Sequence, residues 1–413
     1  MNIRISPPEG ILETTVARLP LSKSIAARLL VMNSLSVGAP AVPDEILPQC
    51  TDTQVLKAAL EGKGDTIDIA DCGTAARFVT ARMAVAEGRR VTITGTQRMS
   101  ERPMAPLVDA LRALGADITY TEREGHLPIA VTGKRLHGGT VRLDAGASSQ
   151  FASALAMIAP TMEQPLRIDL GGEIASMPYL KMTLAMLERR GVETSREGYE
   201  VVVANTPYRP CPAESEPDWS AAAFWYAIAG VTAGWVTLPG MQEHSIQGDN
   251  ILATIGERWG VVTEFTDEGA ELSATPDIFS RMDMDMRDNP DLVPPLAVTA
   301  CLINTPFRFT GVANLRHKES DRIATLTAEL GKCGWLLESG EDFLAWEGAT
   351  RPITELPRMN SHGDHRLAMS FAAIGAFVPT LVIEGAEAVE KSYPGFWDDL
   401  RDAGFSVEIL DEC

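Results

Sequence analysis

Two kinds of helical segment alternate along this chain at a nearly fixed spacing, and this repetition constrains the fold more than any other feature. Six alanine-rich segments, apolar on all sides, begin near Lys23, Gly73, Ser148, Asp218, Pro290 and Asp364. Each is followed by an amphipathic segment that ends in a glycine or a glycine-like turn, and these begin near Thr51, Arg102, Met177, Gly248, Ser320 and Tyr393. The offsets between paired starts are 28, 29, 29, 30, 30 and 29 residues. Such regularity indicates six copies of one supersecondary unit.

Short β-like segments connect and follow these helices. They fall at 91–94, 116–120, 141–143, 201–203 and 381–383, and their β-branched residues favour strands. The first helix of each copy is apolar all round and should be buried, whereas the second shows a polar face. The pattern predicts an α/β repeat architecture with about three copies in each of two domains.

The best boundary between domains lies in residues 205–217, which hold four prolines and two acids in thirteen positions. Such a segment continues neither a helix nor a central strand. Three copies precede it and three follow. A chain of 413 residues is also too long for one ordinary core, so two domains are the natural expectation.

The charge balance excludes some classes of partner. With 36 Lys and Arg against 56 Asp and Glu, the net charge is −20, which argues against a nucleic-acid or anionic-membrane surface but allows small anionic ligands. The six cysteines form no CxxC pair and indicate a reducing compartment. There is no signal-like N-terminus and no apolar run of membrane-spanning length, so we expect a cytoplasmic protein.

Unusual residues collect at the starts of the buried helices. They are Lys23, Ser24 and Arg28; Gly73, Thr74 and Arg77; Ser148, Ser149 and Gln150; Asp291; and His362, Asp364, His365 and Arg366. Serine and aspartate alone would be capping residues. Cations at the positive end of a helix dipole are unfavourable unless an anion holds them there. Because the same rule is broken at equivalent places, we predict a polyanion pocket between the two domains.

The linkers 99–103, 314–322 and 390–394 add further charged residues before the second helices. For 314–322 the alternative reading is a solvated, salt-bridged helix start. His362 and His365 have the spacing of a metal-ligand pair, but no third ligand cluster accompanies them, and no metal is expected.

Eight segments in order along the chain resemble one known family. They are LPLSKSIAAR, GTAARF, ERPMAPLVDALRALGA, SSQF, SMPY, NLRHKESDR, DHRLAM and EKSYPGF, between residues 19 and 396. Together they resemble the 5-enolpyruvylshikimate-3-phosphate synthases, a family of enolpyruvyl transferases. The resemblance implies two similar globular domains, each built of three βαβαββ-type repeats as an inside-out α/β barrel. It assigns 20–216 to the N-terminal domain and 1–19 with 217–413 to the C-terminal domain, with the active site in the interdomain cleft.

The resemblance also implies the two substrates and their sites. Residues expected to bind shikimate 3-phosphate are Lys23, Ser24, Arg28, Ser148, Ser149, Gln150, Ser176, Tyr179, Asp291, Asn314 and Lys318. Those expected to bind phosphoenolpyruvate are Lys23, Gly73, Arg102, Gln150, Arg322, Arg366 and Lys391. Serines at a helix start suit a phosphate, and converging arginines and lysines suit a carboxylate beside a second phosphate.

The implied reaction is an addition–elimination without metal, cofactor or covalent enzyme intermediate. The 5-hydroxyl attacks C2 of phosphoenolpyruvate while C3 is protonated, and phosphate then leaves the tetrahedral intermediate. We expect Asp291 to be the base toward the hydroxyl, Glu319 the acid toward C3, and Lys23 to assist proton movement. The protein is expected to act as a monomer on small molecules, in the synthesis of chorismate and the aromatic amino acids.

The chain departs from the family at Leu21, at Asp71-Cys72 and at Phe78, where glycine, Asn-Ala or Asn-Ser, and proline are usual. These departures lead us to expect an altered response to glyphosate, the inhibitor of the family. Two alternatives remain. One is the sister enzyme that acts on a UDP-amino sugar, whose loop cysteine is missing from 97–103; the other is a non-catalytic phosphosugar-binding relative.

Overall fold

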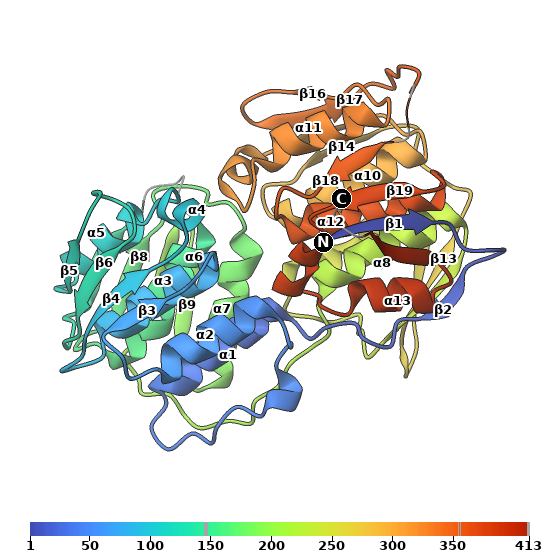
Figure 1. The fold of residues 1–413 in the computed structure, drawn as a ribbon. Helices are drawn as coiled ribbons and strands as arrows, with labels where there is room; N and C mark the ends of the chain where they lie inside the picture. The colour runs from blue at the N-terminus through green and yellow to red at the C-terminus, as the bar shows by residue number, and fades with distance from the viewer. Residues whose placement is uncertain (144–147, 354, 356, 411–413) are drawn as a thin grey trace. The chain divides into compact units, whose positions relative to one another are not determined.

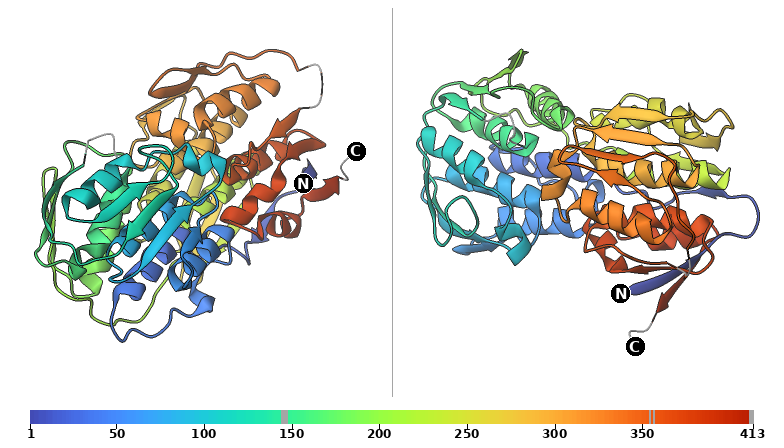
Figure 2. Two further views of the ribbon diagram at one scale, coloured as in Figure 1. Left: turned by 60° about the vertical axis from the view of Figure 1, so that its left-hand side comes forward. Right: turned by 90° about the horizontal axis from the view of Figure 1, so that it is seen from above.

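The N-terminal strand pairs with strands near the C-terminal end of the chain, so the first residues belong to the C-terminal unit. The computed structural model describes residues 1–143, 148–353, 355 and 357–410. Two compact units result: the N-terminal unit, Ser22–Ser215, and the C-terminal unit, Met1–Leu21 with Glu216–Cys413. Strand β1 (Asn2–Ser6) pairs with β19 (Leu381–Glu384) and β20 (Ser406–Leu410) of the C-terminal unit, as Figure 1 and the two views of Figure 2 show.

The N-terminal unit holds three repeats. Its α-helices are α1 (Lys23–Leu35), α2 (Thr51–Glu61), α3 (Gly73–Ala84), α4 (Gln97–Ser100), α5 (Ala105–Ala113), α6 (Ser149–Ile158) and α7 (Met177–Arg189), with 3-10 helices η1 (Asp44–Ile46) and η2 (Ala159–Thr161). Its strands are β3 (Thr66–Asp68), β4 (Arg90–Thr94), β5 (Asp117–Tyr120), β6 (Ile129–Thr132), β7 (Gly139–Arg142), β8 (Leu166–Asp169), β9 (Thr194–Glu197) and β10 (Glu200–Val203).

The C-terminal unit repeats the same alternation. Its α-helices are α8 (Trp219–Thr232), α9 (Leu252–Ile255), α10 (Val293–Leu302), α11 (Arg322–Lys332), α12 (His365–Ala372) and α13 (Phe396–Asp402). Its 3-10 helices are η3 (Gly248–Ile251), η4 (Gly256–Trp259), η5 (Pro290–Leu292), η6 (Ala313–His317), η7 (Ala373–Ala376) and η8 (Ala386–Lys391). Besides β1, β19 and β20 its strands are β2 (Glu13–Thr15), β11 (Trp235–Pro239), β12 (Val261–Phe265), β13 (Gly269–Ala274), β14 (Met282–Asp285), β15 (Phe307–Thr310), β16 (Glu338–Ser339), β17 (Phe343–Trp346) and β18 (Arg358–Asn360).

Five four-stranded sheets share one topology. In β3-β4-β6-β5, the first two strands run parallel and the other neighbours are antiparallel. The sheets β7-β8-β10-β9, β14-β15-β17-β16, β2-β11-β13-β12 and β18-β19-β1-β20 repeat that order. Strands β1 and β2 therefore complete the sheets of the sixth and fourth repeats. The same sheet built five times is the structural form of the sequence repeat.

The first repeat differs from the other five. Helices α1 and α2 are present, but the connection between them contains Pro40, Pro43 and Pro48 and forms only the 3-10 turn η1. Proline removes a ladder donor, so such a segment does not form a central strand. Within the described residues, no separate four-stranded sheet accompanies this repeat.

The alanine-rich helices form the interior of each unit, as their apolar surfaces predict. Helices α1, α3 and α6 pack against one another in the N-terminal unit, and α8, α10 and α12 do so in the C-terminal unit. Small side chains let these helices approach closely, while large ones such as Trp225 and Phe371 fill the remaining space. The predicted inside-out arrangement, with helices inside and sheets outside, is confirmed. Among the described residues, no helix is long and apolar enough to cross a membrane.

Candidate active site

The starts of the three inner helices of the N-terminal unit gather at one end. Gln150 near the start of α6 donates from Nε2 to Thr74 Oγ1 at the start of α3, at 3.3 Å. A small pocket joins the starts of α1, α2 and α3, and its lining includes Lys23, Asp52 and Thr74. Of the residues singled out in this unit, Lys23, Thr74 and Gln150 therefore belong to one cluster of helix N-termini, where backbone N–H groups favour anions.

Lys23 is the first residue of α1, and Ser22 caps the helix by accepting from the N–H of Ile25 at 3.4 Å. Its Nζ lies 2.8 Å from Oδ2 of Asp52 in the first turn of α2. The second oxygen of Asp52, Oδ1, is buried and has no hydrogen-bond partner among the described residues. Ser24 follows in the first turn, and its carbonyl accepts from Arg28 at 2.8 Å.

Arg28 is a buried cation with neutral neighbours. Its guanidinium donates to the Thr183 hydroxyl at 2.6 Å, to the carbonyls of Ser24 and Tyr179 at 2.8 and 2.9 Å, and to Ser153 Oγ at 3.4 Å. The described part of the chain supplies no carboxylate to it. Burial lowers the pKa of Arg28 to about 10. A buried cation without a counterion is costly, so an arriving anion is strongly favoured there.

Tyr179, in the first turn of α7, contacts the same arginine, and Ser176 is the N-cap residue of this helix. Ser176 has a left-handed backbone, with φ of 63°, and its carbonyl accepts from the N–H of Tyr179 at 3.1 Å. A positive φ at a residue with a side chain costs energy and is found most often at functional positions. The Arg28 guanidinium also lies 6.0 Å from the Tyr179 ring centroid.

Because Gly73 has no side chain, the guanidinium groups of Arg77 and Arg102 can lie close to the start of α3. A Cβ at this position would lie 2.6 Å from Nη1 of Arg102 and 2.8 Å from Nη1 of Arg77. Arg77 donates to the carbonyls of Gly73 and Pro103 at 3.0 and 3.3 Å. Arg102 has no hydrogen bond or ion pair from its side chain within the described residues, and its Nε is buried. The arrangement leaves the Arg102 guanidinium available to an anion.

Ser148, Ser149 and Gln150 begin α6. Ser148 is the N-cap and accepts from the N–H of Gln150 at 3.3 Å, whereas Ser149 is buried. The cap residue itself is exposed. The N-terminus of a helix, with its hydroxyl and backbone N–H donors, is a site that binds phosphate in many proteins.

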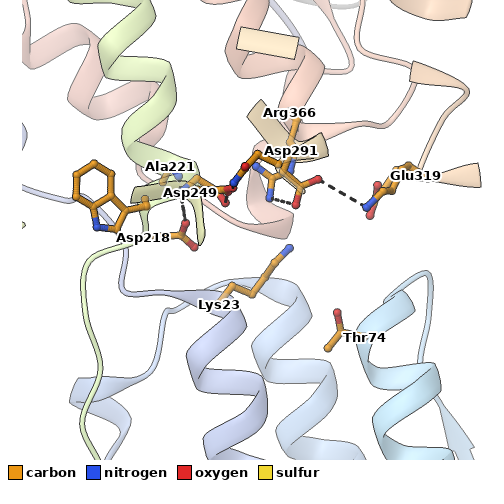
Figure 3. Close-up of polar contacts among 12 residues, drawn as sticks. Lys23, Thr74, Asp218, Ala221, Asp249, Asp291, Glu319 and Arg366 are labelled. Atoms are coloured by element: carbon orange, nitrogen blue, oxygen red, sulfur yellow. Dashed lines mark hydrogen bonds and ion pairs between the residues drawn. The ribbon is translucent and has the colours of Figure 1, made fainter. Parts of the chain in front are cut away.

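Asp291 is the centre of the charged cluster in the C-terminal unit. It belongs to η5, directly before α10, and its Oδ2 accepts from Nη2 of Arg366 at 2.9 Å (Figure 3). Its Oδ1 accepts from Nη1 of Arg322 at 2.9 Å and lies 3.8 Å from Nζ of Lys318. Burial acts to raise the pKa of Asp291, but Arg366, Lys318 and Arg322 together hold it well below its usual range. In this arrangement the carboxylate is ionised and is a weak base.

Arg322, the first residue of α11, joins three carboxylates. Besides Asp291 it donates to Glu319 Oε2 at 2.9 Å and, from Nε, to Asp364 Oδ2 at 2.7 Å. Burial acts to lower the pKa of Arg322, but these three carboxylates raise it above its ordinary value. Asp364 also caps α12 by accepting from the N–H of Arg366 at 3.0 Å. The charges of the three carboxylates are thus matched by three cations, which are Lys318, Arg322 and Arg366.

The remaining predicted residues of this unit are Asn314 and Lys391. Asn314 belongs to η6, and its buried Oδ1 has no hydrogen-bond partner among the described residues. Lys391 ends η8 and is buried.

Two aspartates of the cluster were not among the predicted substrate-binding or catalytic residues: Asp52, and Asp364, which was noted only as one of the unusual residues at a helix start. Both stand at a helix start, where an aspartate is explained by capping or by the helix dipole alone. Asp364 does cap α12, yet its second oxygen holds Arg322. A signal was present in Asp364-His365-Arg366, where an acid and a cation crowd one helix start. Asp52 had no such signal, since its partner Lys23 lies 29 residues away.

Phe78, one of the departures from the family pattern, is buried in α3. The Arg28 guanidinium lies 5.6 Å from the centroid of its ring, so Phe78 supplies part of the wall around that cation.

Comparison with known proteins agrees with the resemblance in the motifs. A family model described as EPSP synthase (3-phosphoshikimate 1-carboxyvinyltransferase) matches residues 10–400. The chain is 41% identical over 415 residues to a 3-phosphoshikimate 1-carboxyvinyltransferase of Bacteroides fragilis, covering 100% of both chains. It is 33% identical to the protein of the same name from Methanoculleus marisnigri, with 93% of this chain and 96% of the relative covered.

The fold agrees as well. A solved structure of EPSP synthase from Acinetobacter baumannii superposes with a TM-score of 0.78 at 22% identity, covering 99% of this chain and 100% of that one. The chain belongs to the EPSP synthase (3-phosphoshikimate 1-carboxyvinyltransferase) family.

Proposed function

We propose that this chain transfers the enolpyruvyl group of phosphoenolpyruvate to the 5-hydroxyl of shikimate 3-phosphate and releases inorganic phosphate. The observation that carries this proposal is the pair of cations in the N-terminal unit, Arg28 and Arg102, for which the described residues provide no carboxylate. Both substrates are polyanions, and guanidinium groups bind phosphate and carboxylate in matched geometry. Family membership along residues 10–400 supports the choice of substrates.

Shikimate 3-phosphate is the ligand of Lys23, Ser24, Arg28, Ser148, Ser149, Gln150, Ser176 and Tyr179 in the N-terminal unit and of Asp291, Asn314 and Lys318 in the C-terminal unit. Phosphoenolpyruvate is the ligand of Lys23, Gly73, Arg102 and Gln150 in the first and of Arg322, Arg366 and Lys391 in the second. The place of Ser148 as the exposed N-cap of α6 supports a phosphate there. The proposal needs both units to serve the same pair of substrates.

The proton transfers fall to Asp291, Glu319 and Lys23. In the addition, Asp291 accepts the proton of the attacking hydroxyl, Glu319 protonates C3, and Lys23 assists. In the elimination, C3 loses a proton while the bond between C2 and the phosphate oxygen breaks, which restores the double bond and releases phosphate. Because Arg322 and Arg366 both donate to Asp291, the carboxylate gains basicity when phosphoenolpyruvate takes over these guanidinium groups. In this proposal, the binding of phosphoenolpyruvate therefore also activates Asp291 as the base.

In this proposal the enzyme acts as a monomer in the cytoplasm on small molecules, in the shikimate pathway. The free thiols of Cys50, Cys72 and Cys301, all buried, support a reducing compartment. The net charge of −20 supports small-molecule substrates over nucleic acid.

Release of inorganic phosphate tests the function. The purified protein should release phosphate when shikimate 3-phosphate and phosphoenolpyruvate are both present, and should release none when either is omitted. Release that requires a UDP-amino sugar in place of shikimate 3-phosphate would establish the sister activity instead. Binding of shikimate 3-phosphate without any phosphate release would identify a non-catalytic relative.

A further inference from the structure

Asp249 is a buried carboxylate that lies next to the proposed catalytic cluster of the C-terminal unit. It belongs to η3 and is 3% exposed. Its Oδ2 accepts a short hydrogen bond from Ser220 Oγ at the start of α8, and its Oδ1 accepts from Nδ2 of Asn289 at 3.0 Å. Asn289 also donates to the carbonyl of Gly248 at 3.0 Å, so the amide group is held by two adjacent acceptors of η3.

Asn289 begins the turn that carries Asp291. Its N–H donates to the carbonyl of Met286 at 3.1 Å, and its own carbonyl accepts from the N–H of Leu292 at 3.1 Å. Pro290 follows and fixes one backbone angle of the turn. The side chain of Asn289 is therefore fixed to η3 while its backbone fixes η5. Two residues further on, Asp291 reaches Arg322 and Arg366, both at 2.9 Å.

We propose that Asp249 is a positioning residue of enolpyruvyl transfer, which acts through Asn289 to hold Asp291 between Arg322 and Arg366. This inference rests on the proposed function, in which Asp291 is the base. Asp249 is placed in Figure 3 beside the Asp291–Arg366 contact, with Asp218 capping α8 near it. A reacting group that is displaced by about 1 Å can lose on the order of 100-fold in rate.

The electrostatics of the cluster agree with this assignment. Burial raises the pKa of Asp249, and the charge of Asp291 adds to the rise, while the hydrogen bonds from Asn289 and Ser220 and the charge of Arg366 oppose it. Burying a carboxylate here destabilises the fold unless its hydrogen bonds compensate. A neutral side chain would fill the same space without the free-energy cost of burying a charge. The carboxylate is therefore better explained by the hydrogen-bond donors that it fixes, Ser220 and Asn289.

The alternative is that Asp249 is needed only for stability, and Asp399 provides the control. Asp399 is also buried in the C-terminal unit, where it accepts from the Tyr393 hydroxyl at 2.7 Å and from Arg18 at 3.0 Å. Within the described part of the chain, no hydrogen bond or ion pair joins Asp399 to Asp291, Arg322 or Arg366. Asp399→Ala should therefore lower stability while kcat stays within about threefold of the parent value.

The experiment uses the full chain and the variants Asp249→Ala, Asn289→Ala, their double variant, and Asp249→Asn. We expect each alanine variant to lower kcat by about 10- to 100-fold, with the KM of phosphoenolpyruvate changed much less. The double variant should be no slower than the slower single variant, because each alanine substitution breaks the same hydrogen bond between Asp249 and Asn289. Asp249→Asn keeps an oxygen acceptor for Asn289 and should recover at least about tenfold over Asp249→Ala.

Three results would overturn the proposal: a kcat of Asp249→Ala within threefold of the parent, multiplicative losses in the double variant, or an equal loss in Asp399→Ala. The parent protein in the same assay separates this proposal from the proposed function, since an inactive parent would refute the latter alone. The positioning role is then tested by equilibrium unfolding of Asp249→Ala, Asp291→Ala and their double variant. Non-additive losses of stability support it, and additive losses contradict it.

Discussion

The arginines of the two units' sites are in opposite states, although Lys23 of the N-terminal unit is paired with Asp52. In the N-terminal unit, Arg28 donates only to neutral groups, and Arg102 has no side-chain partner among the described residues. In the C-terminal unit, Arg322 and Arg366 are hydrogen-bonded to Asp291, and Arg322 also to Glu319 and Asp364. One repeated fold therefore carries two kinds of site arginine: Arg28 and Arg102 have no carboxylate partner among the described residues, whereas Arg322 and Arg366 are neutralised by carboxylates of their own unit.

The physical consequence differs for each unit. A cation without an internal counterion gains most when a ligand arrives, so its removal should weaken binding more than folding. A cation bonded to buried carboxylates is part of the folded structure, so its removal leaves those carboxylates without compensation.

The largest effect should come from the proposed acid and base. Asp291→Ala and Glu319→Gln should each lower turnover by roughly 10²- to 10⁴-fold, because each removes one proton-transfer partner. Binding of shikimate 3-phosphate, measured by calorimetry, should be retained in both variants. Glu347→Gln is the matched control, because Glu347 pairs with the exposed Arg281 and should leave turnover unchanged. Near-normal turnover in either active-site variant would refute the assignment.

Arg322→Ala should have the largest effect on folding. Its side chain is almost completely buried and contacts three carboxylates, so the free energy of unfolding should fall by about 3–5 kcal/mol. Denaturant unfolding of parent and variant measures this. A loss below about 0.5 kcal/mol, the level of an ordinary surface substitution, would show that the network is not a structural element.

The pH dependence of stability should identify Asp291 as an ionised group of the folded state. Its pKa is held well below its usual range, so its stabilising effect is present above the unfolded value of about 3.9 and is lost as the pH falls toward the lower, folded value. The gap in unfolding free energy between the parent and Asp291→Asn should be constant from about pH 8 to 5 and should narrow below about pH 4. A gap that already narrows between pH 8 and 6 would mean that another group titrates.

The smallest effect should come from Phe78→Leu. Loss of the ring that faces Arg28 at 5.6 Å should weaken binding of shikimate 3-phosphate by roughly two- to fivefold. Phe309→Leu is a suitable control, because Phe309 is equally buried but stacks on Phe307 at 4.5 Å instead of a cation. Equal changes in binding for both variants would attribute the effect to packing.

Much of the fold was predictable because it repeats. The spacing of apolar segments predicted helix starts that the structure has at Lys23, Thr51, Gly73 and Met177, and within a few residues elsewhere. The pairing of β1 with β19 and β20 was not visible in any local pattern, since it joins residues at opposite ends of the chain. Register of this kind depends on tertiary packing and not on the sequence of one strand.

The site was predictable in its residue types but not in its partners. Lysine and arginine at the positive end of a helix are locally unfavourable, and this conflict marks Lys23 and Arg366 from the sequence alone. The carboxylates that hold them, Asp52 and Asp291, lie 29 and 75 residues away. No spacing rule connects such positions, because the distance between them is fixed by helix packing. For the same reason, the sequence did not indicate that Asp249 contacts Asn289, which lies 40 residues away.

Arg102→Ala tests the comparison most directly, through the KM for phosphoenolpyruvate set against the free energy of unfolding of the same variant. Because Arg102 has no described internal partner, we predict that KM rises at least about tenfold while the unfolding free energy stays within about 0.5 kcal/mol of the parent. An unchanged KM together with a loss of several kcal/mol in stability would contradict the account.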